Sequence, residues 1–432
     1  MTVCGTATVG RRMDAVPNAL AESPAGHKGL SSAGRRNLVA VLLGGVFQAA
    51  AYGIYETSLP LYLEHMGISF LAMGLIFGLS QTGIVVVRYL VGYQSDLHGR
   101  KPFFVWSLVL SGISAAVIPA WPRPAVILVV RTVREVAGNV REIMRSIVVF
   151  EHSGTRFVSW IGWVVGSEFF FMALGAVAAG AIITGLGYEW TFWISGALSV
   201  VAGLGLARFF KENAAKRKPP ARPVSMLREM LSLDLPPNLW IMTASSFIFN
   251  IGLSASHSFY LLLFWKDKFA LTVVALGTIQ MLHRFALGIP MAFAGRLIDR
   301  PFFARHYKAL YFASMTAQGM SVAVSALILN PYIAVGIFLL HDVLGATFWS
   351  PIHAHFVQDN ARDAQRGRDV ALASGLGSLG LIFGPLLAGL LIDGMGWKNG
   401  PYLASGIITI LAAFLILRLK TGPDLHRPPR KL

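Results

Sequence analysis

The sequence has few charged residues and almost no cysteine. Only 13% of its 432 residues are charged, whereas a soluble globular protein carries about 25% to solvate its surface. The single cysteine, Cys4, excludes an intramolecular disulfide, a zinc site built from thiolates and an iron–sulfur cluster. The chain also lacks the phosphate-binding pattern Gly-x-x-x-x-Gly-Lys-(Ser/Thr), which argues against ATP-driven activity. An ordinary water-soluble enzyme is excluded, and we expect neither enzymatic activity nor a cofactor.

Long apolar stretches are what the sequence has instead, with a mean hydropathy of +0.60. A helix that crosses a bilayer core of about 30 Å needs about 20 apolar residues. Twelve such stretches follow one another: Leu38–Leu61, Leu71–Tyr93, Phe103–Trp121, Pro124–Val148, Phe157–Leu186, Thr191–Phe210, Leu239–Trp265, Val273–Leu297, Tyr307–Leu329, Tyr332–Ile352, Val370–Ile392 and Tyr402–Leu417. Because backbone groups in lipid have to be satisfied within their own segment, we predict an all-α integral membrane protein with twelve transmembrane helices.

Lysine and arginine residues predict the orientation of these helices. With a cytoplasmic N-terminus, about 27 of the 37 basic residues lie on the cytoplasmic side, as the positive-inside rule requires. We therefore expect a multi-pass protein of the cell (inner) membrane with both termini in the cytoplasm. The net charge of +16 is interpreted as an orientation signal and an attraction to anionic membrane lipids rather than to nucleic acid.

The charged stretches also divide the chain into regions. Residues 1–36 are expected to be a disordered cytoplasmic arm and not a signal peptide, because they contain no apolar core region. Residues 37–210 and 238–419 each hold six of the apolar stretches. A basic cytoplasmic loop, residues 211–237, is predicted between them, and residues 420–432 are predicted to form a cytoplasmic tail.

The two six-helix regions resemble each other at nearly constant shifts along the sequence. A shift of 203 residues aligns one set of positions: Gly74, Gly92 and Asp96 with Gly277, Gly295 and Asp299. A shift of 209 aligns another: Gly175 and Gly180 with Gly384 and Gly389. We infer a duplicated six-helix unit, an organisation typical of transporters whose halves move about a site near the membrane midplane.

One loop carries a family motif. The segment Gly92-Tyr-Gln-Ser-Asp96-Leu-His-Gly99-Arg100-Lys101 resembles the signature of the major facilitator superfamily, and Gly295-Arg-Leu-Ile-Asp299-Arg300 resembles the beginning of a second copy. The resemblance implies two pseudo-symmetric six-helix bundles, a monomer and a small-molecule or ion substrate. It also implies a cytoplasmic gate, for which the candidate residues are Gly92, Asp96, Gly99, Arg100, Lys101, Asp299 and Arg300.

Two further segments are similar to motifs of this family. Arg131 resembles the arginine of a motif in the fourth span. Gly384-Pro-Leu-Leu-Ala-Gly389 and its relic, which begins at Gly175, resemble a motif associated with antiporters. The relic lacks the proline in span five, where that motif normally lies, so its support for antiport is reduced.

Ionisable side chains within the spans are candidate functional groups, because each costs about 2.5–3.5 kcal/mol on insertion scales. In this family the first, fourth, seventh and tenth spans line the central cavity. Five of their charged or imidazole groups lie within roughly 8–15 Å of the predicted extracellular face and could form one polar layer: Glu56, Arg131, His257, His341 and Asp342.

These groups suggest roles. Glu56 with Arg131 is the predicted proton-coupling site, although the two could instead form a permanent structural ion pair. The predicted substrate contacts are Glu135, Glu168, His257, His341 and Asp342, of which Glu168 has no pairing partner nearby in the sequence. His257, with serine neighbours, could also be a hydrogen-bonded core residue.

The preferred interpretation is a secondary transporter that exports a small organic molecule in exchange for protons. The alternative within transport is a metal ion or metal chelate such as iron or a siderophore, because Glu56, His257, His341 and Asp342 offer oxygen and imidazole ligands. A non-transporting membrane sensor or scaffold on the same fold is the alternative from another class.

Overall fold

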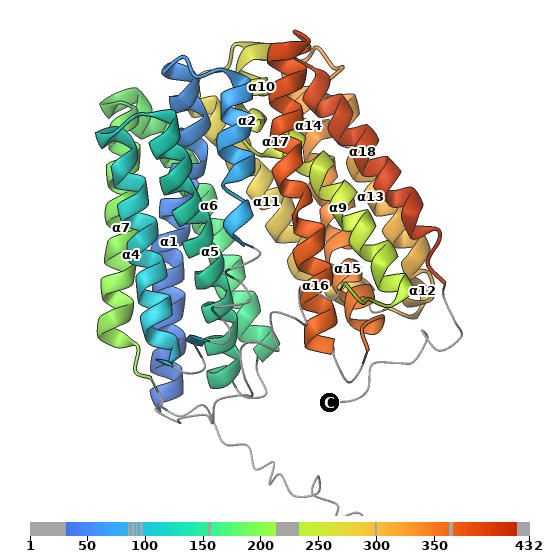
Figure 1. Cartoon of the computed structure of the whole chain (residues 1–432), viewed down its shortest axis with the longest axis horizontal. Coiled ribbons are helices and arrows are strands. Elements are labelled where there is room, and N and C mark those ends of the chain that lie inside the picture. Colours follow the sequence, from blue (N-terminus) through green and yellow to red (C-terminus); the bar gives the residue numbers. More distant parts are fainter. Residues whose placement is uncertain are drawn as a thin grey trace, which may run out of the picture.

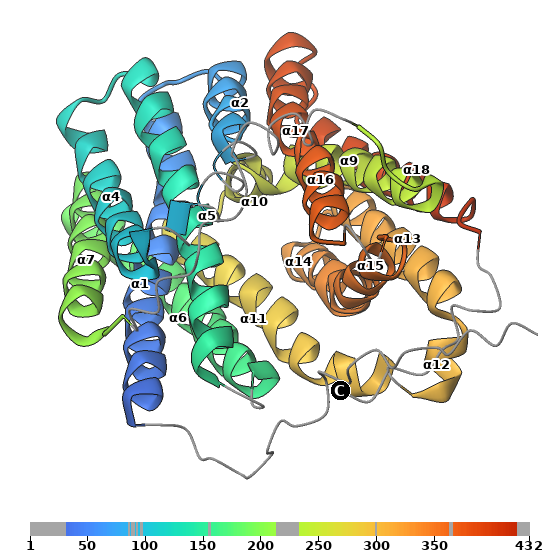
Figure 2. The same cartoon turned by 60° about the horizontal axis from the view of Figure 1, so that its bottom comes forward.

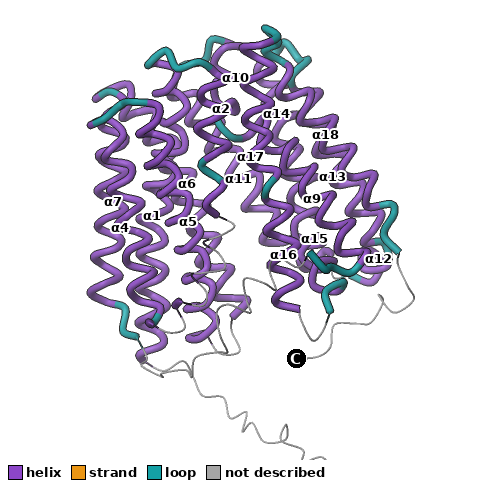
Figure 3. Tube along the Cα trace, in the orientation of Figure 1, coloured by secondary structure: helices purple, strands orange, loops and turns teal. Residues whose placement is uncertain are grey.

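The structure is a computed structural model that describes residues 32–84, 87, 91, 94–95, 98–153, 157–212, 233–298, 300–362 and 366–420. Every regular element within these residues is a helix (Figure 3). Eight helices of the described part are long and apolar enough to cross a membrane, and shorter apolar helices cover residues 70–84 and 400–416. The all-helical prediction is therefore confirmed for the described residues.

The first group of helices lies on the left of Figure 1. It consists of α1 (Ser32–His65), α2 (Phe70–Leu79), α4 (Arg100–Ala120), α5 (Pro124–Ser153), α6 (Phe157–Leu186) and α7 (Tyr188–Phe209). The helix α5 bears many of the charged residues of this group. It also contributes apolar residues, Ile127, Val140 and Val148, to the buried core.

The second group contains more interrupted helices. Its elements are α9 (Pro237–His257), α10 (Tyr260–Phe269), α11 (Val273–Ile298), α12 (Pro301–Arg305), α13 (Tyr307–Ser325), α14 (Pro331–Leu340), the π-helix η2 (His341–Ala346), α15 (Thr347–Asp359), α16 (Arg366–Ser378), α17 (Gly380–Gly389), the π-helix η4 (Leu390–Gly394) and α18 (Gly400–Ile416). The continuous helix predicted for Leu239–Trp265 is wrong, because α9 ends at His257. The backbone leaves the helical conformation at Ser258, where φ is −73° and ψ is −90°.

Two helix crossings join the groups, α2 against α17 and α11 against α6 (Figures 1 and 2). Glycine permits the close approach at both. A Cβ atom at Gly74 would lie 2.5 Å from the Pro385 carbonyl oxygen, and one at Gly277 would lie 2.5 Å from the Ala176 carbonyl oxygen. Gly74 and Gly277 are the positions related by the 203-residue shift, so the sequence repeat marks the two crossings.

The end of the molecule that contains His65 and Lys266 is closed by contacts between the groups, and we call it the closed end. The rings of Phe77 and Phe259 lie 5.7 Å apart within a large buried apolar cluster. At its rim the Lys266 ammonium group lies 2.6 Å from a carboxylate oxygen of Glu64. The ribbons of the two groups diverge from this end toward the opposite one (Figure 1).

Candidate functional site

Two adjoining cavities lie between the helix groups. The larger has a volume of about 360 Å³ and is lined by residues of α1, α4, α5, α6 and α11. The smaller, of about 250 Å³, is lined by residues that include parts of α1, α2, α5, α9 and α17. Tyr52, Glu56 and Glu135 line both cavities. Charged side chains therefore face a space enclosed by helices of both groups.

Glu56 forms an ion pair with Arg284 across the two groups. The expected pairing of Glu56 with Arg131 is wrong in this structure, because Arg131 contacts Glu135, 2.9 Å away and one helical turn along α5. Arg131 also donates a hydrogen bond to the Ser80 hydroxyl at 3.1 Å. Because α11 packs beside α6, its residue Arg284 reaches Glu56 on α1. Arg131 and Glu135 instead share one face of α5.

The guanidinium of Arg134, in the cavity wall, has only part of its hydrogen bonds formed. It is only 3% exposed and lines the larger cavity. One terminal nitrogen donates to the Ser111 carbonyl oxygen at 2.6 Å, and the guanidinium lies 3.8 Å above the Tyr55 ring. Its Nε and its other terminal nitrogen have no hydrogen-bond partner among the described residues. The sequence repeat places Arg134 opposite His341, at a shift of 207 residues, although Arg134 is not among the predicted substrate contacts.

Glu168 is paired, in contrast to what its isolation in the sequence suggests. Its carboxylate lies 3.0 Å from Arg141 and forms a second ion pair with Arg145. All three side chains line the larger cavity, and Glu168 is 5% exposed. One carboxylate thus holds two guanidinium groups that the helix α5 places one turn apart.

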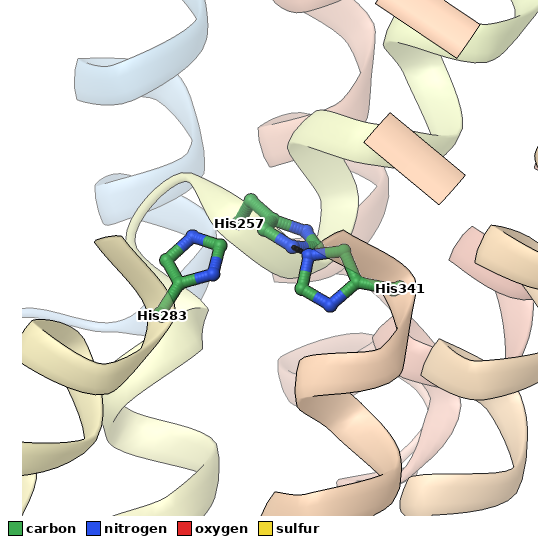
Figure 4. Close-up of side chains that lie close together, drawn as sticks. All are labelled: His257, His283 and His341. Carbon is green, nitrogen blue, oxygen red and sulfur yellow. Dashed lines mark hydrogen bonds between the residues drawn. The ribbon is translucent and has the colours of Figure 1, made fainter. Parts of the chain in front are cut away.

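The second group contributes a histidine cluster (Figure 4). His257, His283 and His341 each have a ring nitrogen within 4.8 Å of the others. His341 Nε2 lies 2.9 Å from His257 Nε2 and 3.3 Å from Asp342 Oδ1. His283 Nδ1 lies 2.6 Å from Asp342 Oδ2. His257 lines the smaller cavity, while His341 and Asp342 are 1% and 2% exposed.

The structure thus brings three predicted residues, His257, His341 and Asp342, into one cluster. It adds His283, which the sequence analysis does not include because the eighth span is not expected to line the cavity. The signal available in the sequence is an imidazole in an otherwise apolar helix, directly before the charged Arg284.

The predicted cytoplasmic gate is only partly within the described residues. Gly92, Asp96 and Asp299 lie outside them. Lys101 is half-buried in the first turn of α4, and Arg300 is exposed and directly precedes α12.

Gly99 and Arg100 make the turn into α4. Gly99 has a φ angle of +91°, in the region that favours glycine. The backbone N–H of Arg100 donates to the Glu212 carboxylate, and its side chain lies 3.3 Å from Glu151. Glu212 lies just after α7, the last helix of the first group in the sequence. Its carboxylate is held at the N-terminus of α4, the positive end of the helix dipole.

A second charged network, which the sequence analysis does not include, lies near the start of α16. Arg362 is 2.7 Å from Asp369 and 2.6 Å from Asp234. Hydrogen bonds from its guanidinium to these two carboxylates, Asp369 first, raise the pKa of Arg362 above its ordinary value. The network connects the segment before α9 with the loop between α15 and α16.

Comparison with known proteins agrees with this architecture. The family model of the Major Facilitator Superfamily matches residues 41–368 and 308–431. The chain belongs to the major facilitator superfamily. It is 22% identical over 415 residues to the hexuronate transporter of Bacillus subtilis (strain 168). The alignment covers 90% of this chain and 94% of that protein. It is 21% identical over 398 residues to multidrug resistance protein 2 of the same organism, with 89% and 95% covered.

Solved structures of this superfamily share the fold. A variant of the nucleoside transporter NupG matches with a TM-score of 0.74 at 14% identity and covers 89% of this chain and all of its own. A bacterial homologue of the human lysosomal transporter Spinster matches with a TM-score of 0.70 at 12% identity, with 91% of this chain and 100% of that chain covered. As a member of this superfamily, the protein is an integral multi-pass membrane transporter of small solutes rather than an enzyme.

Proposed function

We propose that this transporter exports a small organic anion in exchange for protons. Its twelve spans would form two pseudo-symmetric bundles, residues 37–210 and 238–419, that rock about the central cavities. The observation that carries the proposal is the ion pair between Glu56 and Arg284, because it spans α1 and α11 within a cavity wall. A change in the separation of the bundles would change this pair.

Proton coupling follows from the two environments that this motion offers Glu56. In this structure the Glu56 carboxylate pairs with the Arg284 guanidinium. When α1 and α11 separate, the carboxyl group loses its cation within a cavity of low dielectric constant, where the neutral form is favoured. Each cycle can therefore bind a proton in one state and release it in the other.

The substrate class is proposed from the charge balance of the larger cavity. Three guanidinium groups, those of Arg141, Arg145 and Arg284, have carboxylate partners there. Arg134 contributes a guanidinium with two unpartnered nitrogens in the same wall. A carboxylate or phosphate can accept two parallel hydrogen bonds from such a group. We therefore assign Arg134 to the anionic end of the substrate.

The substrate contacts predicted from the sequence take different places in this proposal. Glu135 and His257, which line the cavities, are proposed to contact the substrate directly. Glu168 is proposed to hold the arginines beside the substrate. His341 and Asp342 lie behind His257, so they would act through it.

Export across the inner membrane is proposed from the orientation predicted by the basic residues. The likeness to multidrug resistance protein 2 supports this direction, while the likeness to the hexuronate transporter supports an anionic solute. Both termini would be cytoplasmic, the closed end extracellular, and the gate motif, including Arg100 and Lys101, on the cytoplasmic side. We further propose a monomer surrounded by membrane lipids, as is usual in the superfamily.

A second candidate function, transport of a metal ion or its chelate, is favoured by one observation. His257, His283 and His341 place three imidazoles beside a carboxylate at the edge of the smaller cavity. Imidazole and carboxylate groups are ligands for several divalent transition metals.

The test is transport by purified protein in liposomes with an imposed pH gradient. The panel contains sugar acids and other small organic anions, their neutral analogues, organic cations and divalent metal ions. We expect anions to move against their gradient, coupled to the pH difference, while neutral analogues do not. Movement of none of these solutes under any ion gradient would contradict the proposal and favour a sensor or scaffold.

A further inference from the structure

We propose that His257, His283, His341 and Asp342 form a binding site for one divalent ion of the late first-row transition metals, with Zn²⁺ and Co²⁺ as representative ions. The three histidines come from the end of α9, the middle of α11 and the start of η2, three elements that meet only in the folded chain (Figure 4). The proposal concerns equilibrium binding, so it does not require that the metal ion be transported.

The hydrogen bonds of the cluster determine where the ring protons lie. His341 Nδ1 is bonded to the Phe338 carbonyl oxygen, which can only accept, so this nitrogen carries the proton. His341 Nε2 then presents a lone pair. His283 Nδ1 donates to Asp342 Oδ2 at 2.6 Å, which leaves His283 Nε2 with a lone pair as well.

Electron-rich atoms therefore converge on His341 Nε2. His257 Nε2 lies 2.9 Å away and Asp342 Oδ1 lies 3.3 Å away. His257 Nδ1 lies 3.2 Å from the Leu253 carbonyl oxygen, which can only accept, and 2.7 Å from the Ser256 hydroxyl, which can accept or donate. A proton on Nδ1 satisfies both of these groups and leaves a lone pair on Nε2. With this tautomer, two imidazole lone pairs and a carboxylate oxygen face one another, an arrangement that a cation between them would stabilise.

The spacing suits a metal ion after a small adjustment. Two nitrogen ligands at about 2.0–2.1 Å from a tetrahedral metal lie about 3.3 Å apart. The separation of His341 Nε2 from Asp342 Oδ1 already has this value, and the two Nε2 atoms need to separate by a few tenths of an ångström. Asp342 also orients His283 through the hydrogen bond to Nδ1, the arrangement that fixes the tautomer of metal-binding histidines.

The cluster can be reached from the transport pathway. His257 is partly exposed and lines the smaller cavity, whereas His283 and His341 are buried. Nitrogen and carboxylate ligands without thiolate favour the late first-row divalent ions, which prefer imidazole, over Mg²⁺ or Ca²⁺, which prefer oxygen.

The experiment uses the full chain, purified without a histidine tag, treated with a chelator and titrated with Co²⁺ in detergent. We expect the visible absorption bands of tetrahedral Co²⁺ to saturate at one equivalent and to disappear when Zn²⁺ is added. His283→Gln and His341→Gln should each weaken Co²⁺ binding at least tenfold. His355→Gln is the matched control, because His355 forms an exposed pair with Asp359 at 3.3 Å further along the same span.

Thermal unfolding provides a second readout that does not depend on absorption bands. Zn²⁺ should raise the melting temperature of the wild-type protein and of the His355→Gln variant but not that of His341→Gln. A proton shared between His257 and His341 in place of a metal would give no Co²⁺ bands and no shift with Zn²⁺, and would overturn the proposal. Unchanged Co²⁺ affinity in His283→Gln and His341→Gln would overturn it as well. Because neither measurement needs transport, failure of this site leaves the anion transport proposal separately testable.

Discussion

The two helix groups place their polar layers at equivalent positions of the sequence repeat but use different chemistry. The equivalent pairs, at shifts of 201, 203 and 207 residues, are Glu56 and His257, Ser80 and His283, Arg134 and His341, and Glu135 and Asp342. The residues of the first group are mainly guanidinium and carboxylate groups. Those of the second group are mainly imidazoles, which can bind metal ions. The polar layer therefore occupies equivalent positions in the two groups, but the chemical groups that form it differ.

Packing supports the equivalence of Glu56 and His257 in the sequence repeat. Gly175 packs against the backbone of Ala50, and Gly384 packs against the backbone of Ile251 in the equivalent crossing of the second group. Gly175 and Gly384 are repeat partners, so the same relation extends along α1 and α9 to Glu56 and His257.

Glu56→Gln should have the largest effect on transport, because it removes the only carboxylate proposed to bind the coupling proton. We expect transport driven by a pH gradient to be abolished, while exchange of substrate across the membrane without a gradient is retained. Glu64→Gln is the matched control, since Glu64 is also on α1 and also pairs with the second group, but at the rim of the closed end. Gradient-driven transport that persists in Glu56→Gln would assign coupling to another residue.

Arg134→Gln should raise the KM for an organic anion by about 10- to 100-fold, because a charge-assisted hydrogen bond contributes about 1.5–3 kcal/mol. Arg134→Lys keeps the charge without the planar fork and should give an intermediate KM. His341→Gln changes the equivalent position of the second group and should raise this KM less than Arg134→Gln does, because His341 would act on the substrate only through His257. Equal losses at Arg134 and His341 would remove the distinction between the two layers.

Glu168→Gln should lower the free energy of unfolding by about 3 kcal/mol, because it leaves Arg141 and Arg145 buried without their carboxylate. Glu64→Gln should cost less than about 1 kcal/mol, since the Glu64–Lys266 pair is partly exposed. Denaturant unfolding of both variants in the same detergent measures the difference. Similar losses in the two variants would show that burial does not govern these pairs.

Gly74→Ala and Gly277→Ala should destabilise the protein by similar amounts, about 1–3 kcal/mol, because each adds a methyl group 2.5 Å from a backbone oxygen at a repeat-related crossing. Gly166→Ala is the control, as nothing lies within 4 Å of a Cβ atom at that position. Its effect should be within about 0.5 kcal/mol. Unequal effects at Gly74 and Gly277 would contradict the equivalence of the two crossings.

Much of the helical architecture could be predicted from the sequence, because apolar length and recurring glycines act locally. Each predicted apolar stretch contains a helix, and the repeated Gly74 and Gly277 mark the crossings. The break after α9 could not be predicted from apolar length, since the stretch stays apolar on both sides of Ser258, where the backbone leaves the helix.

Side-chain pairing was less predictable than the position of the charges. Glu56 and Arg131 both line the smaller cavity, but the partner of Glu56 comes from α11, 228 residues further along the chain. Which residue faces another across a cavity depends on the rotation of each helix about its axis, and apolar stretches alone do not determine it. The same limit applies to His283, which becomes adjacent to His341 only after α11 packs beside η2.

The most direct test of alternating motion between the groups is a cross-link across the closed end. In a Cys4→Ser background, Glu64→Cys and Lys266→Cys are joined by a short cleavable bismaleimide, and transport into liposomes is measured before linking, after linking and after cleavage. Asp267→Cys with Lys398→Cys is the control, because that pair, 3.2 Å apart in the wild type, lies within the second group. The account predicts that transport stops only with the link between Glu64 and Lys266 positions and returns on cleavage. Full transport by the quantitatively linked protein would contradict it.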